Sequence, residues 1–298
     1  MFSLFNRTNN LRCNISNLVV KALENNETPW QKPWQGTGKG VGFPMDARTK
    51  KKFFGINFLL LQMAAKEHGF VSSWWGTSDQ FAMLGSKVKN RPTDIMPGYW
   101  GTETVFYDQQ FGKTNTIPSV VYNADQLEVK LKNYLPDFNI NPSYDLAEKV
   151  LHATNAKIKF NDEGEAWYFY PPKDYILLPK KRIFEDGWGG LPGYYESLAH
   201  ELIHWSEVRM GFDVDCDEGI RELRADIGAA MLMEELHVPH SISFSNYNKW
   251  QDHWIHMLKK DYNLIFLICA SASHAVEFIK RFSMKPETRF NQISESAA

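Results

Sequence analysis

The chain has 298 residues, of which 43% are hydrophobic, enough for the core of one large or two medium domains. Its formal net charge of -2 indicates no particular partner, and its three scattered cysteines, Cys13, Cys216 and Cys269, exclude a disulfide framework or a Cys-x-x-Cys metal clip. No apolar stretch is long enough to span a membrane, and the polar N-terminus lacks the apolar segment of a signal peptide. We therefore expect a soluble protein of a reducing, cytoplasmic compartment with no membrane partner.

The charge is unevenly distributed along the chain. Residues 1–100 carry 13 Lys and Arg against 6 Asp and Glu, a net charge of +7, whereas residues 101–298 carry 20 against 29, a net charge of -9. A basic first third followed by an acidic remainder favours a polyanionic partner for the first third alone. The alternative interpretation is a chance asymmetry.

The first half of the chain is expected to mix helices with strands. Apolar residues recur at helical spacing over residues 14–26, and Thr77 with Gln80 forms the capping box of a short helix that stops near Gly85. The remaining elements expected here are a Pro- and Trp-rich extended segment over residues 28–34, a glycine loop over 36–42, a helix over 56–68, and strands over 99–107 and 119–122.

The polar, Pro-containing stretch at residues 130–143 is the best candidate for a domain boundary. Beyond it we expect a helix with Leu146, Ala147, Val150 and Leu151 in the core, three short strands, and mainly helices after Gly193. The fold class is therefore expected to be α+β, with one domain over residues 1–135 and a second over residues 136–298. The second domain is expected to combine a small antiparallel sheet with helices; its strands are predicted at residues 156–160, 166–170 and 175–178.

The strongest chemical signal is the His-Glu-x-x-His motif at residues 200–204. It lies in a segment with helical periodicity, and residues four apart on a helix share a face, so His200 and His204 can bind one metal ion. Glu201 lies beside the first histidine, where its carboxylate can take a proton from a water and later pass it to a leaving amine. The alternative is a surface helix with two unconnected histidines.

A catalytic zinc site needs a third protein ligand and leaves one position open. Glu222 and Asp226 stand four apart on the next expected helix, a spacing that suits one carboxylate on the metal and a second that orients a ligand histidine. Glu222 has the longer reach, but Asp226 can also be the ligand, or either acid can pair with Arg221 or Arg224. We expect Zn²⁺, and such a ligand set also accepts Mn²⁺ or Co²⁺.

The first hundred residues interleave cations with aromatic rings, as non-specific binding of single strands requires. Four cations between residues 48 and 52 run directly into two phenylalanines, and nothing in the chain resembles a module that reads duplex DNA. About half of the aromatic rings are expected in the core instead. The candidate DNA-binding residues are Trp30, Lys32, Trp34, Arg48, Lys50, Lys51, Lys52, Phe54, Trp74, Trp75, Lys87 and Lys89.

With both motifs considered, the chain resembles the ArdC-type antirestriction family of conjugative plasmids. In the N-terminal half the resemblance rests on Thr28-Pro29-Trp30-Gln31-Lys32-Pro33-Trp34, Phe54-Gly55-Ile56-Asn57, and Trp74-Trp75-Gly76-Thr77 through Gln80 to Leu84-Gly85. In the C-terminal half it rests on Tyr194-Tyr195-Glu196-Ser197-Leu198-Ala199 leading into residues 200–205, and on Glu222-Leu223-Arg224-Ala225-Asp226-Ile227-Gly228-Ala229.

The resemblance implies an N-terminal single-stranded-DNA-binding domain, as found in conjugative primases, and a zincin domain distantly similar to Spartan-type proteases. It also implies that His200 and His204 bind metal, that Glu201 is the catalytic position, and that Glu222 or Asp226 completes the site. The implied role is protection of incoming plasmid DNA from restriction enzymes during conjugation, with restriction enzymes or DNA-bound proteins as substrates.

Two alternatives stand beside this enzyme. One is a non-enzymatic coat protein on single-stranded DNA, with a structural or vestigial metal site. The other is an inhibitor that mimics DNA, for which the acidic run Asp213, Asp215, Asp217 and Glu218 would be the signal, although the basic first third argues against it.

Overall fold

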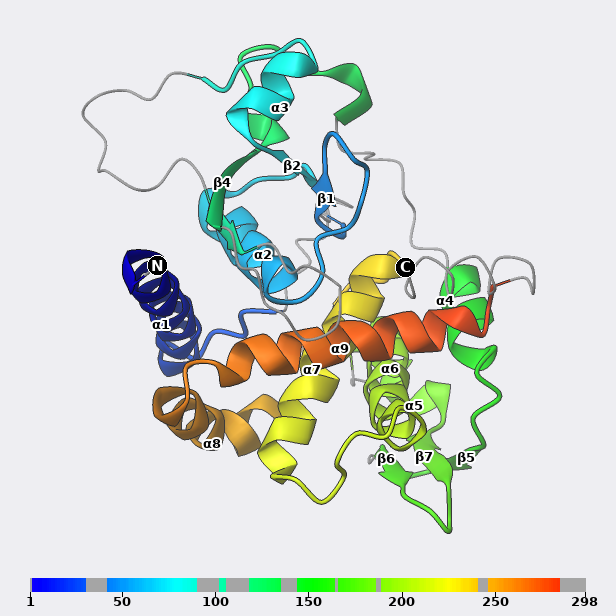
Figure 1. Ribbon diagram of the computed structural model, residues 1–298. Helices are drawn as coiled ribbons and strands as arrows, with labels where there is room; N and C mark the ends of the chain where they lie inside the picture. The colour runs from blue at the N-terminus through cyan, green and yellow to red at the C-terminus, as the bar shows by residue number, and fades with distance from the viewer. Residues whose placement is uncertain are drawn as a thin grey trace.

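The computed structural model describes residues 2–30, 42–89, 102–105, 118–134, 144–163, 166–185, 189–240 and 246–284. Figure 1 shows a small lobe with short strands and short helices at the top, above a larger body made mainly of helices. The expected α+β class is confirmed. The predicted domain boundary at residues 135 and 136 falls outside the described residues.

The small lobe is a four-stranded sheet with the order β1-β2-β4-β3. Its strands are β1 (Met45–Asp46), β2 (Trp74–Gly76), β3 (Thr102–Val105) and β4 (Pro118–Asn123). Strand β1 pairs with β2 in parallel, and the other pairs are antiparallel. The helices of this half are α2 (Ile56–His68), which is confirmed at its predicted bounds, α3 (Ser78–Met83), and the 3-10 turns η1 (Ala124–Gln126) and η2 (Lys132–Tyr134).

Local sequence signals set the ends of α3. The Thr77 hydroxyl accepts a hydrogen bond from the backbone N–H of Gln80, and the Gln80 side chain accepts one from the backbone N–H of Thr77, which confirms the predicted capping box. The two tryptophans of β2 point to opposite sides, because successive side chains in a strand alternate. Trp75 is 1% exposed and packs in the core, whereas Trp74 is only partly covered.

The largest hydrophobic cluster takes residues from both halves of the chain, and two smaller clusters lie within residues 47–134. Helix α1 (Phe2–Glu24), longer than the predicted 14–26, packs against α8 (Asn246–Lys260) from the far end of the chain. Trp30 lies edge-on to Trp254 of α8, with 5.6 Å between ring centroids, and both are buried. One hydrophobic cluster therefore joins the N-terminal helix to the helical body.

A second, three-stranded sheet lies beside the helical body and has the order β5-β7-β6. Its strands are β5 (Ile158–Asn161), β6 (Trp167–Phe169) and β7 (Tyr175–Pro179), and the helices α4 (Tyr144–His152) and α5 (Lys181–Glu185) flank them in the chain. The expectation of an antiparallel sheet is wrong in one respect, because β5 pairs with β7 in parallel. Leu146, expected in the core, is 41% exposed, while Ala147, Val150 and Leu151 are buried.

The helices α6 (Gly190–Arg209) and α7 (Glu218–Glu235) carry the metal motif, and α9 (Leu264–Arg281) packs on both. The two helices approach closely at Gly228 of α7, where a Cβ atom would lie 2.7 Å from Cδ1 of Ile203 on α6. A side chain at this position would push the helices apart. Glycine therefore sets the distance across which histidines and carboxylates of the two helices meet.

Among the described residues, no single helix is long and apolar enough to cross a membrane. The segments Lys249–Lys260 and Leu264–Arg281 meet the length and composition criteria only as a pair bent by 117°.

A buried histidine ties the segment after α7 back to both helices. His240 is 7% exposed; its Nδ1 lies 3.3 Å from Oε1 of Glu196 on α6, and its Nε2 lies 3.5 Å from Oε1 of Glu234 on α7. Burial opposes the charged imidazole, but the two carboxylates outweigh this effect and raise the pKa of His240 to about 9. The imidazolium therefore helps hold the ends of α6 and α7 together.

We expect His240 to make protein stability depend on pH. Since its folded pKa of about 9 lies above the ordinary value of 6.5, its contribution is complete below pH 6.5 and is lost as pH rises through 9. The free energy of unfolding of the native protein should fall by about 3 kcal/mol over that range from this group. His240→Gln should lack this fall in urea unfolding curves, whereas the control His256→Gln, at an exposed position of α8, should keep it. Parallel pH profiles for His240→Gln and the native protein would contradict this assignment.

Candidate metal centre

Helix α6 presents the two histidines of the motif on one face, one turn apart. Both are buried, His200 at 3% and His204 at 4% exposure. Their Nε2 atoms lie 3.2 Å from each other and point to the same place between α6 and α7. The helical spacing four apart thus brings two imidazole nitrogens to a single point.

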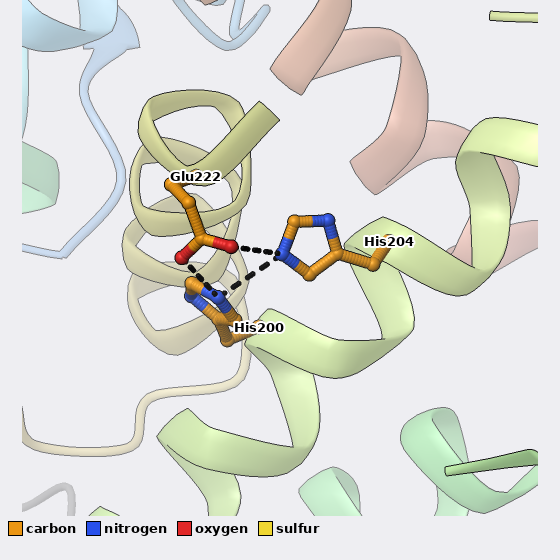
Figure 2. A group of neighbouring side chains, drawn as sticks. All are labelled: His200, His204 and Glu222. Carbon is orange, nitrogen blue, oxygen red and sulfur yellow. Dashed lines mark hydrogen bonds and ion pairs between the residues drawn. The ribbon is translucent and has the colours of Figure 1, made fainter. Parts of the chain in front are cut away.

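Glu222 of α7 completes a set of three converging ligand atoms (Figure 2). Its Oε2 lies 3.5 Å from Nε2 of His200, and its Oε1 lies 3.4 Å from Nε2 of His204. Ligand atoms of a tetrahedral zinc ion with bonds of about 2.0–2.1 Å stand about 3.3–3.4 Å apart. The observed separations fit a divalent metal ion held by these three side chains.

Asp226 lies on the other side of His200. Its Oδ1 is 2.9 Å from Nδ1 of that histidine, away from the point where the three ligand atoms converge. Glu207 is placed in the same way beside His204, with 3.3 Å between Oε2 of Glu207 and Nδ1 of His204. A carboxylate on the far nitrogen fixes the ring and makes the near nitrogen a better ligand. The geometry therefore gives Asp226 an orienting position rather than a place among the converging atoms.

Sequence reasoning did not identify Glu207, although it lies three residues after His204 on the same helix face. Its side chain is fully buried, and it accepts hydrogen bonds from the Tyr170 hydroxyl at 2.7 Å and from Nη1 of Arg224 at 2.5 Å. Arg221 lies 3.5 Å from the same carboxylate. Arg221 and Arg224 thus form ion pairs with Glu207. The alternative interpretation of the sequence, in which they pair with Glu222 or Asp226, is wrong.

The electrostatics of the centre follow from burial and mutual pairing. Burial alone would raise the pKa of Glu222, yet its hydrogen bonds with His200 and His204 hold it far below the usual range. For His204, burial favours the neutral ring, but Glu207 and Glu222 outweigh it and raise the pKa to about 9. Since a histidine must be neutral to bind a metal, metal binding at this site competes with protons.

Glu201 lies next to the converging atoms and is 6% exposed. Burial raises its pKa above the usual value, while the nearby histidines and a backbone hydrogen bond from Tyr168 in β6 oppose that rise. A carboxyl group with a raised pKa is better matched to taking and returning a proton near neutral pH. The backbone of β6 therefore helps position this carboxylate.

The candidate DNA-binding residues fall into three groups. Trp30 and Trp75 are each 1% exposed and belong to the core, so the prediction that they stack on bases is wrong for this conformation. Lys32 and Trp34 lie outside the described residues. The remaining candidates are wholly or partly exposed: Arg48, Lys50, Lys51, Lys52, Phe54, Trp74, Lys87 and Lys89.

Lys52 is partly exposed and is already paired with a carboxylate. Its Nζ lies 2.5 Å from the carboxylate of Glu235 at the end of α7, and Lys280 of α9 lies 2.5 Å from the same carboxylate. The pairing across 183 positions joins the small lobe to the helices of the metal centre. Lys52 thus contributes to the contact between the small lobe and α7, and its predicted contact with DNA stays a prediction.

Three cations that form no ion pair with a carboxylate among the described residues, Arg48, Lys50 and Lys51, lie on the turn that begins at Asp46. The Asp46 side chain accepts hydrogen bonds from the backbone N–H groups of Arg48, at 3.0 Å, and Thr49, at 2.6 Å, which fixes the turn. Lys50 has a φ of 60° and places its ammonium 4.3 Å from the ring centroid of Trp74 and 3.7 Å from that of Tyr134. The predicted neighbours Arg48, Lys50 and Trp74 therefore share one surface.

Two family matches cover most of the chain. Residues 9–133 match the N-terminal domain of anti-restriction factor ArdC, and residues 145–273 match the zincin-like metallopeptidases.

Individual proteins give the same result. The chain is 27% identical to the antirestriction protein ArdC from plasmid R388 in its Mn(II)-bound crystal structure, with a TM-score of 0.71 over 93% of this chain and 99% of that one. A metal-free structure of the same protein has a TM-score of 0.70 at 26% identity, covering 92% of this chain and 97% of that one. The chain is also 28% identical, over 91% of its length, to a DNA primase TraC of Escherichia coli, of which it spans 27%. It is 21% identical over 89% of its length to the Sinorhizobium fredii protein y4eC, of which it spans 90%.

Metal affinity should distinguish the carboxylates that orient the histidines, Glu207 and Asp226, from the proposed ligand Glu222. We expect Glu207→Gln and Asp226→Asn to weaken metal binding about 10–100-fold, because each leaves a ligand histidine without its anionic partner. Glu222→Gln should weaken binding more strongly, because it removes a converging ligand atom. Isothermal titration with Mn²⁺ and Zn²⁺ measures all three. If Asp226→Asn abolishes binding as completely as Glu222→Gln, then Asp226 is itself a ligand.

Proposed function

We propose that this chain of the ArdC antirestriction family, which combines the N-terminal domain of ArdC with a zincin-like metallopeptidase domain, binds single-stranded DNA and carries a metal-dependent peptidase acting on DNA-associated proteins. In this proposal it works in the cytoplasm of a cell receiving a conjugative plasmid. Restriction enzymes and other proteins bound to the incoming strand are the substrate class.

The observation that carries the peptidase is the arrangement around His200, His204, Glu222 and Glu201. Three ligand atoms converge and leave one side of the site without a further protein ligand among the described residues. Structural zinc sites are usually closed by four protein ligands, whereas catalytic sites hold three. The buried carboxyl group of Glu201 lies close enough to His200, His204 and Glu222 for their charges to affect its pKa, as a peptidase requires of its base. We propose His200, His204 and Glu222 as the ligands.

In the proposed reaction, the metal and the residues around it would have separate roles. A divalent metal, Zn²⁺ or Mn²⁺, would supply the Lewis acidity that activates a water and polarises a peptide carbonyl. Glu201 would take the proton of the attacking water and return it to the leaving amine. Asp226 and Glu207 hold the two imidazole rings in place, and the Tyr168 backbone N–H keeps the Glu201 carboxylate aimed at the same point.

The proposed DNA surface is the turn that carries Arg48, Lys50 and Lys51, together with Trp74 and the exposed Lys87 and Lys89. Cations would contact phosphates, and the ring of Trp74 would stack on a base once Lys50 moves off its face. The relative named a DNA primase supports a DNA partner. Because the chain spans 27% of that protein, we propose no primase activity.

The second candidate is a coat protein whose metal site has only a structural role. The rigid attachment of the small lobe through Lys52 and Glu235 suits either function. What favours the enzyme is Glu201, since a structural metal needs no buried carboxyl group on its open side.

We expect Glu201→Gln to abolish cleavage of a protein crosslinked to single-stranded DNA, while metal content and DNA affinity stay unchanged. The substitution removes the proton acceptor and preserves the shape of the side chain, so a loss of at least about 100-fold is expected. Equal cleavage by both proteins would exclude Glu201 as the base. Absence of cleavage by the native protein, with tight DNA binding by both, would favour the coat protein.

The two neighbouring lysines should differ in DNA binding. Lys51→Ala should weaken binding to an oligothymidylate and reduce the slope of log K against log salt by about 0.7, the value for one lost phosphate contact. Lys52→Ala should leave that slope unchanged, because its ammonium already pairs with Glu235. Fluorescence anisotropy across a salt series measures both. An equal loss in the two variants would contradict the proposed surface.

A further inference from the structure

The three-stranded sheet beside the metal centre has an inner and an outer face of different character. Tyr168, Ile176 and Leu178 point inward and are buried. Side chains alternate along a strand, so Trp167 and Phe169 of β6 point outward, and so does Tyr175 of β7, which pairs with Phe169. Trp167 is 52% exposed, so its ring is accessible from solvent.

The outward rings are arranged with two lysines in a layered stack. Phe169 and Tyr175 lie face to face, with 4.7 Å between centroids and 26° between planes. The Nζ atom of Lys159 on β5 lies 3.7 Å from the Tyr175 ring centroid, and that of Lys173 lies 4.9 Å from the Phe169 centroid. We call Lys159, Trp167, Phe169, Lys173 and Tyr175 the outer sheet face.

Around this face the described aspartates are paired with basic side chains, whereas two lysines have no carboxylate partner among the described residues. Asp174 is paired with Arg209 at 2.8 Å, and Asp162 is paired with Lys180 at 2.8 Å and with Arg182. In the described part of the chain, Lys159 and Lys173 form no ion pair with a carboxylate. The face thus displays two uncompensated cations beside an open indole ring, in a portion of the chain whose net charge is otherwise negative.

We propose that the outer sheet face is a second binding site for single-stranded nucleic acid, separate from the surface of the small lobe. Trp167 would stack on a base, and Lys159 and Lys173 would contact the flanking phosphates. Exposed aromatic side chains on a sheet, with cations beside them, are how many proteins hold unpaired strands. A polynucleotide brings a negative charge with every base, so it matches both features at once, whereas a protein partner would need carboxylates opposite each lysine.

Strand β6 connects the outer sheet face to the candidate metal centre. Tyr168 lies between Trp167 and Phe169 in β6, and its backbone N–H donates to the Glu201 carboxylate. Figure 1 shows the sheet at the lower end of the molecule and the small lobe at the upper end, with α6 and α7 between them. Nucleic acid held at both ends would therefore flank the metal centre without covering the inner face of the sheet.

The test is the number of short strands that one full-length chain binds. We choose an oligothymidylate of about eight nucleotides, within the range of a single binding surface, and count bound strands by native mass spectrometry and titration calorimetry. The native protein should bind two. The variant with Lys159→Ala, Trp167→Ala and Lys173→Ala should bind one, with the affinity of the lost site reduced at least about fivefold. Lys149→Ala, an exposed lysine of α4 away from any ring, is the matched control and should still bind two.

The proposal is overturned if the sheet variant binds as many strands as the native protein with the same affinity and salt dependence. Thermal unfolding checks that the variant is folded, as expected for exposed positions. The variant with Arg48→Ala and Lys51→Ala separates this site from the proposed function. If that variant loses all binding, the sheet site is absent and the small-lobe surface stands. If it loses none while the sheet variant loses all, the reverse holds.

Discussion

The close approach of α6 and α7 is the constraint on which the rest of the structure depends. Gly228 lets the two backbones come near enough for His200 and His204 to meet Glu222. The same proximity buries several carboxylates between the helices, and a buried charge is tolerated only when it is paired. The helix pair therefore needs a counter-ion for each acid, and its chemistry follows from that need.

Histidines are the partners of most of these buried carboxylates, and each of the three histidines lies between two acidic side chains. His204 lies between Glu207 and Glu222, His200 between Glu222 and Asp226, and His240 between Glu196 and Glu234. His200 and His204 share Glu222, and their ligand atoms converge where a cation can bind, whereas His240 shares neither of its carboxylates with these two histidines. Histidine–carboxylate pairs between α6 and α7 thus form the candidate metal centre at His200 and His204, and at His240 they connect the two helices.

The sequence predicted what depends on local spacing and missed what depends on distant contacts. The capping box of α3, the helix over residues 56–68 and the two histidines on one face follow from residues three or four apart. It left Glu222 and Asp226 unresolved, because which acid reaches Nε2 depends on how α7 crosses α6. The burial of Trp30 depends on Trp254, and the pairing of Lys52 depends on Glu235, partners that no local pattern reveals.

The contacts of the small lobe bear on how DNA binding and the proposed chemistry are connected. Lys52 binds Glu235 at the end of α7, the helix that carries Glu222, and the backbone N–H of Gly55 donates to the Ser273 hydroxyl of α9 at 2.8 Å. Because both contacts are to helices packed around the metal centre, the lobe is held in a defined position rather than at the end of a free linker. A strand bound to it would bring DNA-associated proteins to a fixed distance from Glu201, and confinement of this kind raises the local concentration of a substrate without any specific contact to it. Such an enzyme needs little recognition of its protein substrate, since the DNA selects it.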